Sequence, residues 1–205
     1  MKKKTLALLA ALVLVIGCII GGTLAWLTAK SDVVTNTFTT SDINIKLEET
    51  KGTAVTGGKE FKMIPGYELE KDPKAWVVAG SEDCYLFVKL EKSQNFDTFL
   101  TYKMADGWEL VPGETNVYYR IVTSEQMSSD NGATNAYSIL AGDKVTVSED
   151  ITKEQMNALN VEGAEKPTLT ITAYASQLYK NNNATDNTFT AAQAWDNAQP
   201  PTPAP

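Results

Sequence analysis

The side chains that most often carry out catalysis are scarce in this chain. Its 205 residues include no histidine, so the commonest general base and the commonest zinc ligand are both missing. The sequence also lacks the His-Glu-x-x-His helix of zinc peptidases, the Gly-x-Ser-x-Gly elbow of hydrolases and a cysteine–histidine pair. We therefore expect a protein that is not an enzyme and that holds no cofactor and no metal ion.

Charged residues gather in two places, at residues 68–72, which include Asp72, and at Glu82 and Asp83. Short clusters of this kind are most often solvated loop residues. A calcium site at Glu82 and Asp83 requires further oxygen ligands, which the sequence does not identify. We interpret both clusters as surface charge.

Two cysteines remain as possible nucleophiles or cross-links. Cys84 begins the apolar run of residues 84–88, so we expect a buried and inert thiol. Cys18 ends the four residues 15–18, which fit the pattern of a bacterial lipoprotein. The apolar residues that follow it favour an ordinary side chain within a hydrophobic run.

The N-terminus has the pattern of an export signal. Three lysines at positions 2–4 precede an uncharged stretch over residues 5–27, and the small residues Thr23 and Ala25 suit a signal peptidase. We predict a signal peptide at residues 1–25, cut between Ala25 and Trp26. An uncleaved anchor is an alternative, because the stretch is long enough to span a membrane, and an acylated lipoprotein is another. The cleaved signal predicts a secreted protein with no stable membrane anchor.

The formal net charge is −7, and loss of the three leading lysines makes it more negative. No basic stripe offsets this charge. An acidic chain of this kind is not expected to bind nucleic acid or an anionic membrane.

The remaining sequence predicts an all-β fold. Residues 42–48 alternate polar and apolar side chains, as a strand with one face on a core does. Further runs rich in β-formers lie at residues 75–79, 85–90, 116–122, 144–148 and 168–175. In the last run, Leu169, Ile171, Ala173 and Ala175 share one face. Several short strands separated by turn residues indicate a two-sheet antiparallel sandwich over residues 41–197.

One or two short helices interrupt this pattern. Thr152 and Gln155 form a capping box that predicts a helix at residues 153–160. Thr190 and Gln193 repeat the spacing before Trp195. Residues 198–205 form a proline-rich tail, which we expect to be extended.

Several stretches resemble one family. They are residues 21–29 with Asn36-Thr37-Phe38, residues 63–66, residues 71–77 followed by 84–89, and residues 173–177. In these the chain resembles the TasA/camelysin proteins of Gram-positive bacteria, which are exported with a dedicated signal peptidase and assembled into biofilm matrix fibres. The resemblance implies a jelly-roll-like sandwich and polymerisation by exchange of the N-terminal strand. It also implies an extracellular matrix or cell-surface location.

We hypothesise that the extension at residues 26–40 joins subunits head to tail. Its β-prone core contains no proline and comprises Val33, Val34, Thr35, Asn36, Thr37 and Phe38. Such a segment can add a strand to the open sheet edge of another copy. The same residues can instead form the first strand of their own domain. The expected partners are further copies of this chain, other matrix proteins and, during export, the signal peptidase.

The alternative function is a monomeric extracellular module that binds a surface or a polysaccharide. Exposed aromatic residues would carry that function, and the candidates are Trp108, Tyr118, Tyr119 and Trp195. Some camelysin relatives are described as metallopeptidases, but the missing histidines argue against that activity here.

Overall fold

The structure is a computed structural model that describes residues 42–129, 135–180 and 187–199. The chain divides into two compact units, Met1–Thr40 and Ser41–Pro205, and every described residue belongs to the second. The predicted cleavage site at Ala25 and Trp26 and the predicted joining strand at residues 33–38 lie outside the described residues. Both therefore stay predictions.

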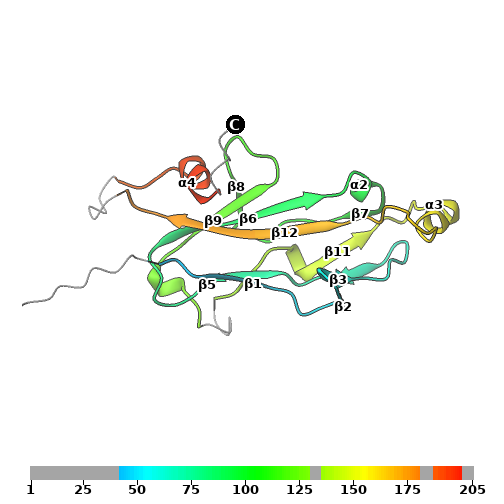
Figure 1. The fold of residues 1–205 in the computed structure, drawn as a ribbon, viewed down its shortest axis with the longest axis horizontal. Coiled ribbons are helices and arrows are strands. Elements are labelled where there is room, and N and C mark those ends of the chain that lie inside the picture. Colours follow the sequence, from blue (N-terminus) through cyan, green and yellow to red (C-terminus); the bar gives the residue numbers. More distant parts are fainter. Residues whose placement is uncertain (1–41, 130–134, 181–186, 200–205) are drawn as a thin grey trace, which may run out of the picture. The chain divides into compact units, whose positions relative to one another are not determined.

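The largest sheet of the second unit has four antiparallel strands in the order β12-β6-β9-β8 (Figure 1). Their bounds are Leu169–Gln177 (β12), Cys84–Lys92 (β6), Val117–Val122 (β9) and Glu109–Leu110 (β8). Strand β6 pairs with β12 over nine residues and with β9 over six. It is therefore the central strand of this sheet.

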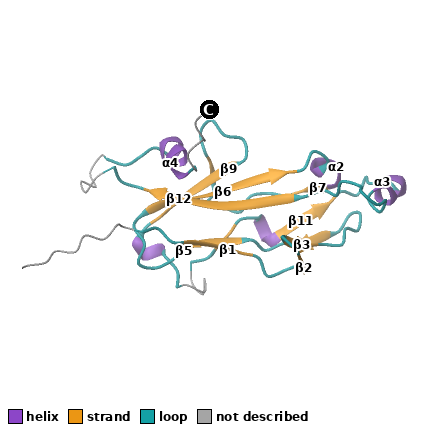
Figure 2. Ribbon diagram, viewed as in Figure 1, coloured by secondary structure: helices purple, strands orange, loops and turns teal. Residues whose placement is uncertain are grey.

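Two smaller antiparallel sheets form the opposite layer (Figure 2). One has the order β1-β5-β10, with bounds Ile45–Glu48, Lys74–Val77 and Tyr137–Ser138. The other has the order β4-β11-β7, with bounds Glu68–Glu70, Lys144–Val147 and Leu100–Thr101. A separate hairpin joins β2 (Thr53–Val55) to β3 (Gly58–Glu60). Gly57 takes a φ of 84° in its turn, a value that suits glycine.

Three short α-helices and two 3₁₀ turns complete the described part of the chain. The α-helices are α2 (Phe96–Phe99), α3 (Lys153–Ala158) and α4 (Ala191–Ala198), and the 3₁₀ turns are η1 (Ser124–Gln126) and η2 (Ala141–Asp143). Both predicted capping boxes are confirmed, at Thr152 with Gln155 and at Thr190 with Gln193. Helix α2 was not predicted.

The alternation of side chains along β6 divides the interior into two clusters. Leu86, Val88 and Leu90 face the smaller sheets and belong to the main core. Tyr85 and Phe87 point the other way, where Ala194 and Trp195 of α4 cover them. Because both faces of β6 are covered, its sequence is a nearly continuous apolar run and not an alternating one.

The fold class predicted from the sequence is confirmed as an all-β antiparallel sandwich. All six predicted strands are present, with ends shifted by at most three residues. In β12, Leu169, Ile171 and Ala173 face the main core, as predicted, and Tyr174 faces the cluster under α4. Strands β2, β3, β4, β7, β8 and β10 were not predicted, since two or three residues are too few to show a period.

Candidate functional site: an open edge of the sandwich

The first charge cluster lies on strand β4 and next to it, not in a solvated loop as expected. Glu68 and Glu70 are exposed on the strand and pair with Lys144 at 2.6 Å and with Lys51 at 3.0 Å. Exposed ion pairs of this kind contribute little to stability. Each of these two carboxylates is paired with a lysine, and the two do not form a recognisable catalytic or metal-binding arrangement.

The expectation that Asp72 is a solvated surface charge is wrong, because only 8% of its surface is exposed. Its carboxylate accepts the backbone N–H groups of Thr50 and Lys51, at 3.0 and 2.8 Å, and the hydroxyl of Thr50 at 2.5 Å. Burial opposes ionisation of this carboxyl, but these hydrogen bonds hold its pKa below the ordinary value. Asp72 therefore anchors the chain just after β1.

Cys84 is fully buried, as expected from its apolar run. Burial, with a smaller contribution from the charge of Asp83, raises the pKa of its thiol to about 12. A thiol of this kind stays protonated and is a poor nucleophile. Asp83 itself accepts the backbone N–H of Ser124 at 2.7 Å, so it ties two turns together.

Two further properties hold for residues 42–129, 135–180 and 187–199. No three acidic or cysteine side chains in these ranges come together in a way that suits a metal ion. None of the helices in these ranges is both long enough and apolar enough to span a membrane.

The four aromatic residues proposed for a binding surface do not form one. Trp108 and Trp195 are buried, and their indole N–H groups donate to the carbonyl of Ser138 and to a carboxylate oxygen of Glu114. Tyr119 is half-buried, and its hydroxyl donates to Glu109. Only Tyr118 has a hydroxyl without a protein partner among the described residues.

The feature that stands out is the long outer edge of β12. This strand has nine residues and pairs only with β6 among the described strands. The other outer strands of the two layers are shorter, at two residues for β7, β8 and β10, three for β4 and four for β1. An unpaired strand edge exposes a row of N–H and C=O groups that another strand can bind.

Two hydrogen bonds establish which residues of β12 face outward. The N–H of Ser93 donates to the carbonyl of Thr168, and the N–H of Leu178 donates to the carbonyl of Asp83, each at 3.0 Å. Backbone groups alternate in direction along an antiparallel ladder, so the even-numbered residues of β12 bond to β6. The backbone groups that point away from β6 belong to Leu169, Ile171, Ala173, Ala175 and Gln177.

Strand β1 is open in the same way on the other layer. The N–H of Val78 donates to the carbonyl of Asn44 at 2.8 Å, so the even-numbered residues of β1 bond to β5. Ile45 and Leu47 therefore direct their backbone groups outward, while their side chains pack against the core. Strands β1 and β12 approach one another across the two layers, so on this side both layers end in a strand that has no further partner among the described strands.

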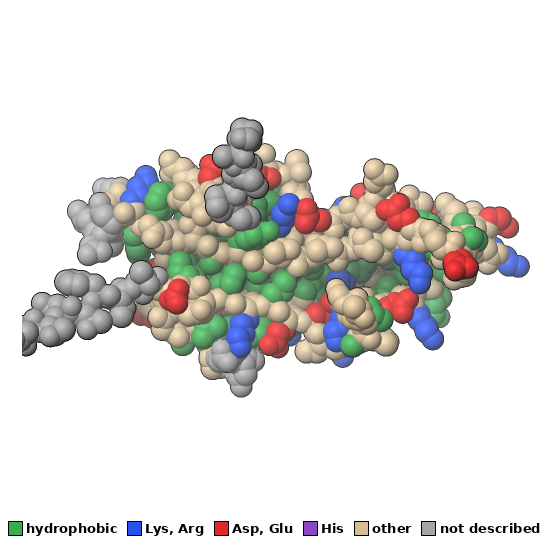
Figure 3. Space-filling model, in the orientation of Figure 1, with side chains coloured by type: hydrophobic (Ala, Val, Ile, Leu, Met, Phe, Trp, Pro, Cys, Tyr) green, Lys and Arg blue, Asp and Glu red, His purple; other side chains and the backbone are tan. Residues whose placement is uncertain are grey.

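An apolar strip runs between these two edges. The hydrophobic side chains on this side are only partly buried, namely Ile43, Ile45, Leu47, Leu169, Ile171 and Ala173. Figure 3 shows the corresponding band of hydrophobic atoms between the two layers. We call the two strand edges with this strip the open edge. It offers backbone hydrogen bonds and apolar contacts side by side.

Strand β12 of the open edge lacks the usual protection against pairing with another strand. Natural edge strands often carry charged residues or proline, or they are short. Strand β12 has the sequence LTITAYASQ, with no charge and no proline. This role of β12 was not predicted, although the uncharged composition of residues 169–177 is visible in the sequence.

Comparisons with known proteins do not add to this description. No family model, no curated protein and no solved structure matches the chain. The candidate site therefore rests on the geometry of the described residues.

Proposed function

We propose that the protein is a secreted structural subunit that polymerises into extracellular matrix fibres. In this proposal, the segment at residues 33–38 of one copy adds a strand to the open edge of the next copy. The observation that carries the proposal is the nine-residue uncharged edge of β12, which has no strand partner among the described residues.

The chemistry of the segment complements the open edge. In an extended strand, Val34 and Phe38 lie on one face and Thr35 and Thr37 on the other. The apolar face suits the strip that includes Leu47 and Ile171. The backbone of the segment suits the outward N–H and C=O groups, so main-chain bonds supply affinity and side chains supply register.

The arrangement allows the subunits to assemble into a filament. The segment at residues 33–38 and the open edge belong to different parts of the sequence. A contact between two unlike surfaces is head to tail, and it extends indefinitely when its rotation does not close a ring.

The N-terminal sequence supports export, with cleavage between Ala25 and Trp26 by a signal peptidase. The resemblance to TasA/camelysin proteins supports a place in the matrix or on the surface of a Gram-positive bacterium. It also supports a jelly-roll connectivity and co-assembly with other matrix proteins.

The test compares two charged variants with the unchanged chain, each exported from a Gram-positive host. Val34→Asp with Phe38→Asp places charges on the apolar face, where an unpaired charge is costly to bury. Thr35→Asp with Thr37→Asp adds the same charge on the opposite face and is the matched control. We expect filaments from the unchanged chain and the control, and only monomers from the first variant.

Electron microscopy of the extracellular material gives the readout, and N-terminal sequencing should begin at Trp26. Filaments from the Val34→Asp, Phe38→Asp variant would rule out strand exchange through this face. An unchanged chain that is retained in the membrane, or that stays monomeric at high concentration, would contradict the fibre function itself.

A further inference from the structure

A second feature lies away from the outer edge of β12, near the end of β6. A cavity of about 320 Å³ is lined there by Leu90, Lys92, Tyr102, Thr115, Asn116 and Tyr118. These residues come from β6, from β9 with the loop before it, and from the residue after β7. The volume is at the small end of the range for ligand sites, about 300–1,000 Å³, and suits a single small ring.

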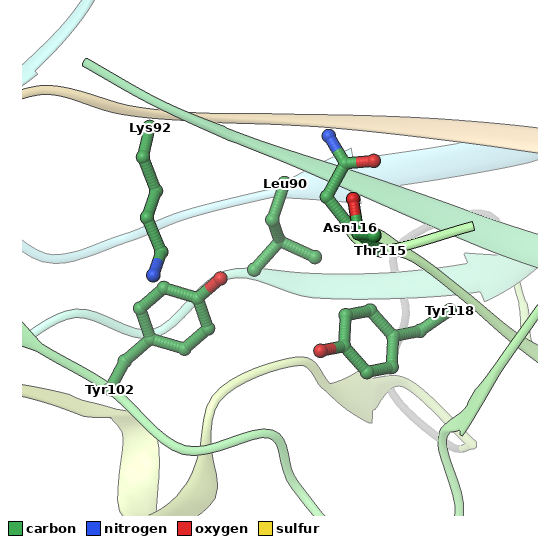
Figure 4. A pocket seen from close by; sticks show the side chains of 6 residues that line it. All are labelled: Leu90, Lys92, Tyr102, Thr115, Asn116 and Tyr118. Carbon is green, nitrogen blue, oxygen red and sulfur yellow. The ribbon is translucent and has the colours of Figure 1, made fainter. Parts of the chain in front are cut away.

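The lining of this cavity is mainly polar, and several of its polar groups have no protein partner among the described residues. Leu90 lies between the two tyrosines, and the hydroxyls of Tyr102 and Tyr118 point toward the space beneath it (Figure 4). Among the described residues, these two hydroxyls and the side chains of Thr115 and Asn116 make no hydrogen bond to protein. Together they can donate and accept several hydrogen bonds.

The hydroxyl of Tyr102 remains a neutral donor. Burial, followed by the nearby Tyr118 and the charge of Asp97, raises its pKa to about 12. The contribution of Tyr118 is consistent with two phenol groups that share one small space.

The lining carries no unpaired charge. The ammonium of Lys92 lies 2.8 Å from a carboxylate oxygen of Asp97, and it also sits over the rings of Phe96 and Tyr102 at 5.5 and 5.1 Å. This cation therefore already has an anionic partner. An anionic ligand would have to compete with Asp97 for Lys92, whereas an uncharged polar ligand has no such requirement.

We propose that this cavity binds one uncharged sugar ring. A pyranose presents C–H groups on its faces and hydroxyls around its rim. The C–H groups suit the rings of Tyr102 and Tyr118, and the rim hydroxyls suit the unpaired polar groups of these tyrosines and of Asn116. This site is separate from the proposed fibre function, so either can fail without the other.

The experiment is an NMR titration of the isotopically labelled full-length protein. The probes are D-glucose, D-galactose, D-mannose and N-acetyl-D-glucosamine, with D-glucuronate as the charged comparator. We expect saturable shifts at the backbone amides of the cavity residues with at least one neutral sugar, and weaker binding of glucuronate.

Tyr118→Phe and Asn116→Ala each remove a polar group of the cavity, and we expect each to weaken binding about two- to tenfold. Tyr67→Phe is the matched control, because this tyrosine is 62% exposed and does not line the cavity. We expect it to leave the affinity unchanged. If Tyr118→Phe lowers the melting temperature, Asn116→Ala alone provides the test, because Asn116 is only half-buried and its truncation should disturb the fold less.

The proposal is overturned if none of the four neutral sugars gives saturable shifts at the cavity. It is also overturned if glucuronate binds more tightly than the neutral sugars. Equal affinity in the unchanged protein, Tyr118→Phe and Asn116→Ala would place any binding elsewhere and reject the assignment.

Discussion

Strands β6 and β12 are neighbours along nine residue pairs, yet they have opposite relations to the rest of the molecule. Strand β6 has a strand on each side and a hydrophobic cluster on each face. Strand β12 has one described strand partner, and most of its residues are only partly buried. Strand β6 mainly stabilises the fold, whereas β12 combines a stabilising ladder with an outer edge that no described strand covers.

The same distinction applies to the two clusters that meet β6. Tyr85 and Phe87 are closed off beneath α4, whereas the main core is incompletely covered between β1 and β12. An open edge therefore does not require a poorly packed fold, because this one lies beside β6, which is packed on both faces.

The largest expected effect comes from truncating an aromatic side chain on each strand. Phe87 on β6 is fully buried, with its ring 5.4 Å from that of Trp195, and Tyr174 on β12 is half-buried, with its ring 5.1 Å from the same residue. We expect Phe87→Ala to lower the free energy of unfolding by about 3–5 kcal/mol and Tyr174→Ala to lower it less. Urea denaturation measures both. Equal losses would break the contrast between the strands.

A second comparison places proline at adjacent residues of β12. Thr172 directs its N–H toward β6, so Thr172→Pro removes a ladder hydrogen bond and leaves a carbonyl of β6 unpaired, which should cost at least about 1–3 kcal/mol. Ala173 directs its N–H outward, so Ala173→Pro should cost less and should abolish filaments by blocking the edge. Thermal unfolding and electron microscopy measure the two effects. Filaments from folded Ala173→Pro would show that this edge is not used.

The smallest expected effect concerns β1, the other strand of the open edge. Asp72→Asn weakens the hydrogen bonds that hold Thr50 and Lys51, and it should lower the free energy of unfolding by about 1–3 kcal/mol at neutral pH.

The pH dependence of that effect has a defined sign. The folded-state pKa of Asp72 lies below its ordinary value of 3.8. The stabilisation from its charged form is therefore complete well above pH 3.8 and is lost as the pH falls through the lower folded-state pKa. The difference in unfolding free energy between the unchanged protein and Asp72→Asn should shrink over that acid range. A constant difference would mean that the charge of Asp72 does not contribute.

The sequence predicts the long strands because their patterns are strong. Residues 84–88 form a continuous apolar run, and Leu169, Ile171 and Ala173 alternate with polar residues. Each pattern places apolar side chains along a full face of a strand, and that face has to be buried. The three-residue strand β4, with the sequence Glu-Leu-Glu, is held by pairing with β11, which no local pattern shows. The buried state of Asp72 depends on Thr50 and Lys51, which lie more than twenty residues away.

The sequence suggests only one of the two parts of the proposed joint. The segment at residues 33–38 is β-prone and stays a prediction, whereas no sequence pattern points to the edge that it is proposed to bind. Whether a strand such as β12 lies in the middle of a sheet or at its edge depends on the order of strands in space. That order follows from the contacts of the whole fold, and the composition of residues 169–177 contributes only a hint.

The nine residue pairs between β12 and β6 also have a mechanical consequence. A neighbour bound along the outer edge of β12 would pull parallel to the strands when the fibre is stretched. Such a force shears the whole ladder at once and does not peel its hydrogen bonds apart one after another. The load then passes through β12 into β6, which is the most firmly held strand of the described sheet, so a joint at this edge would resist tension better than one at the two-residue strand β8.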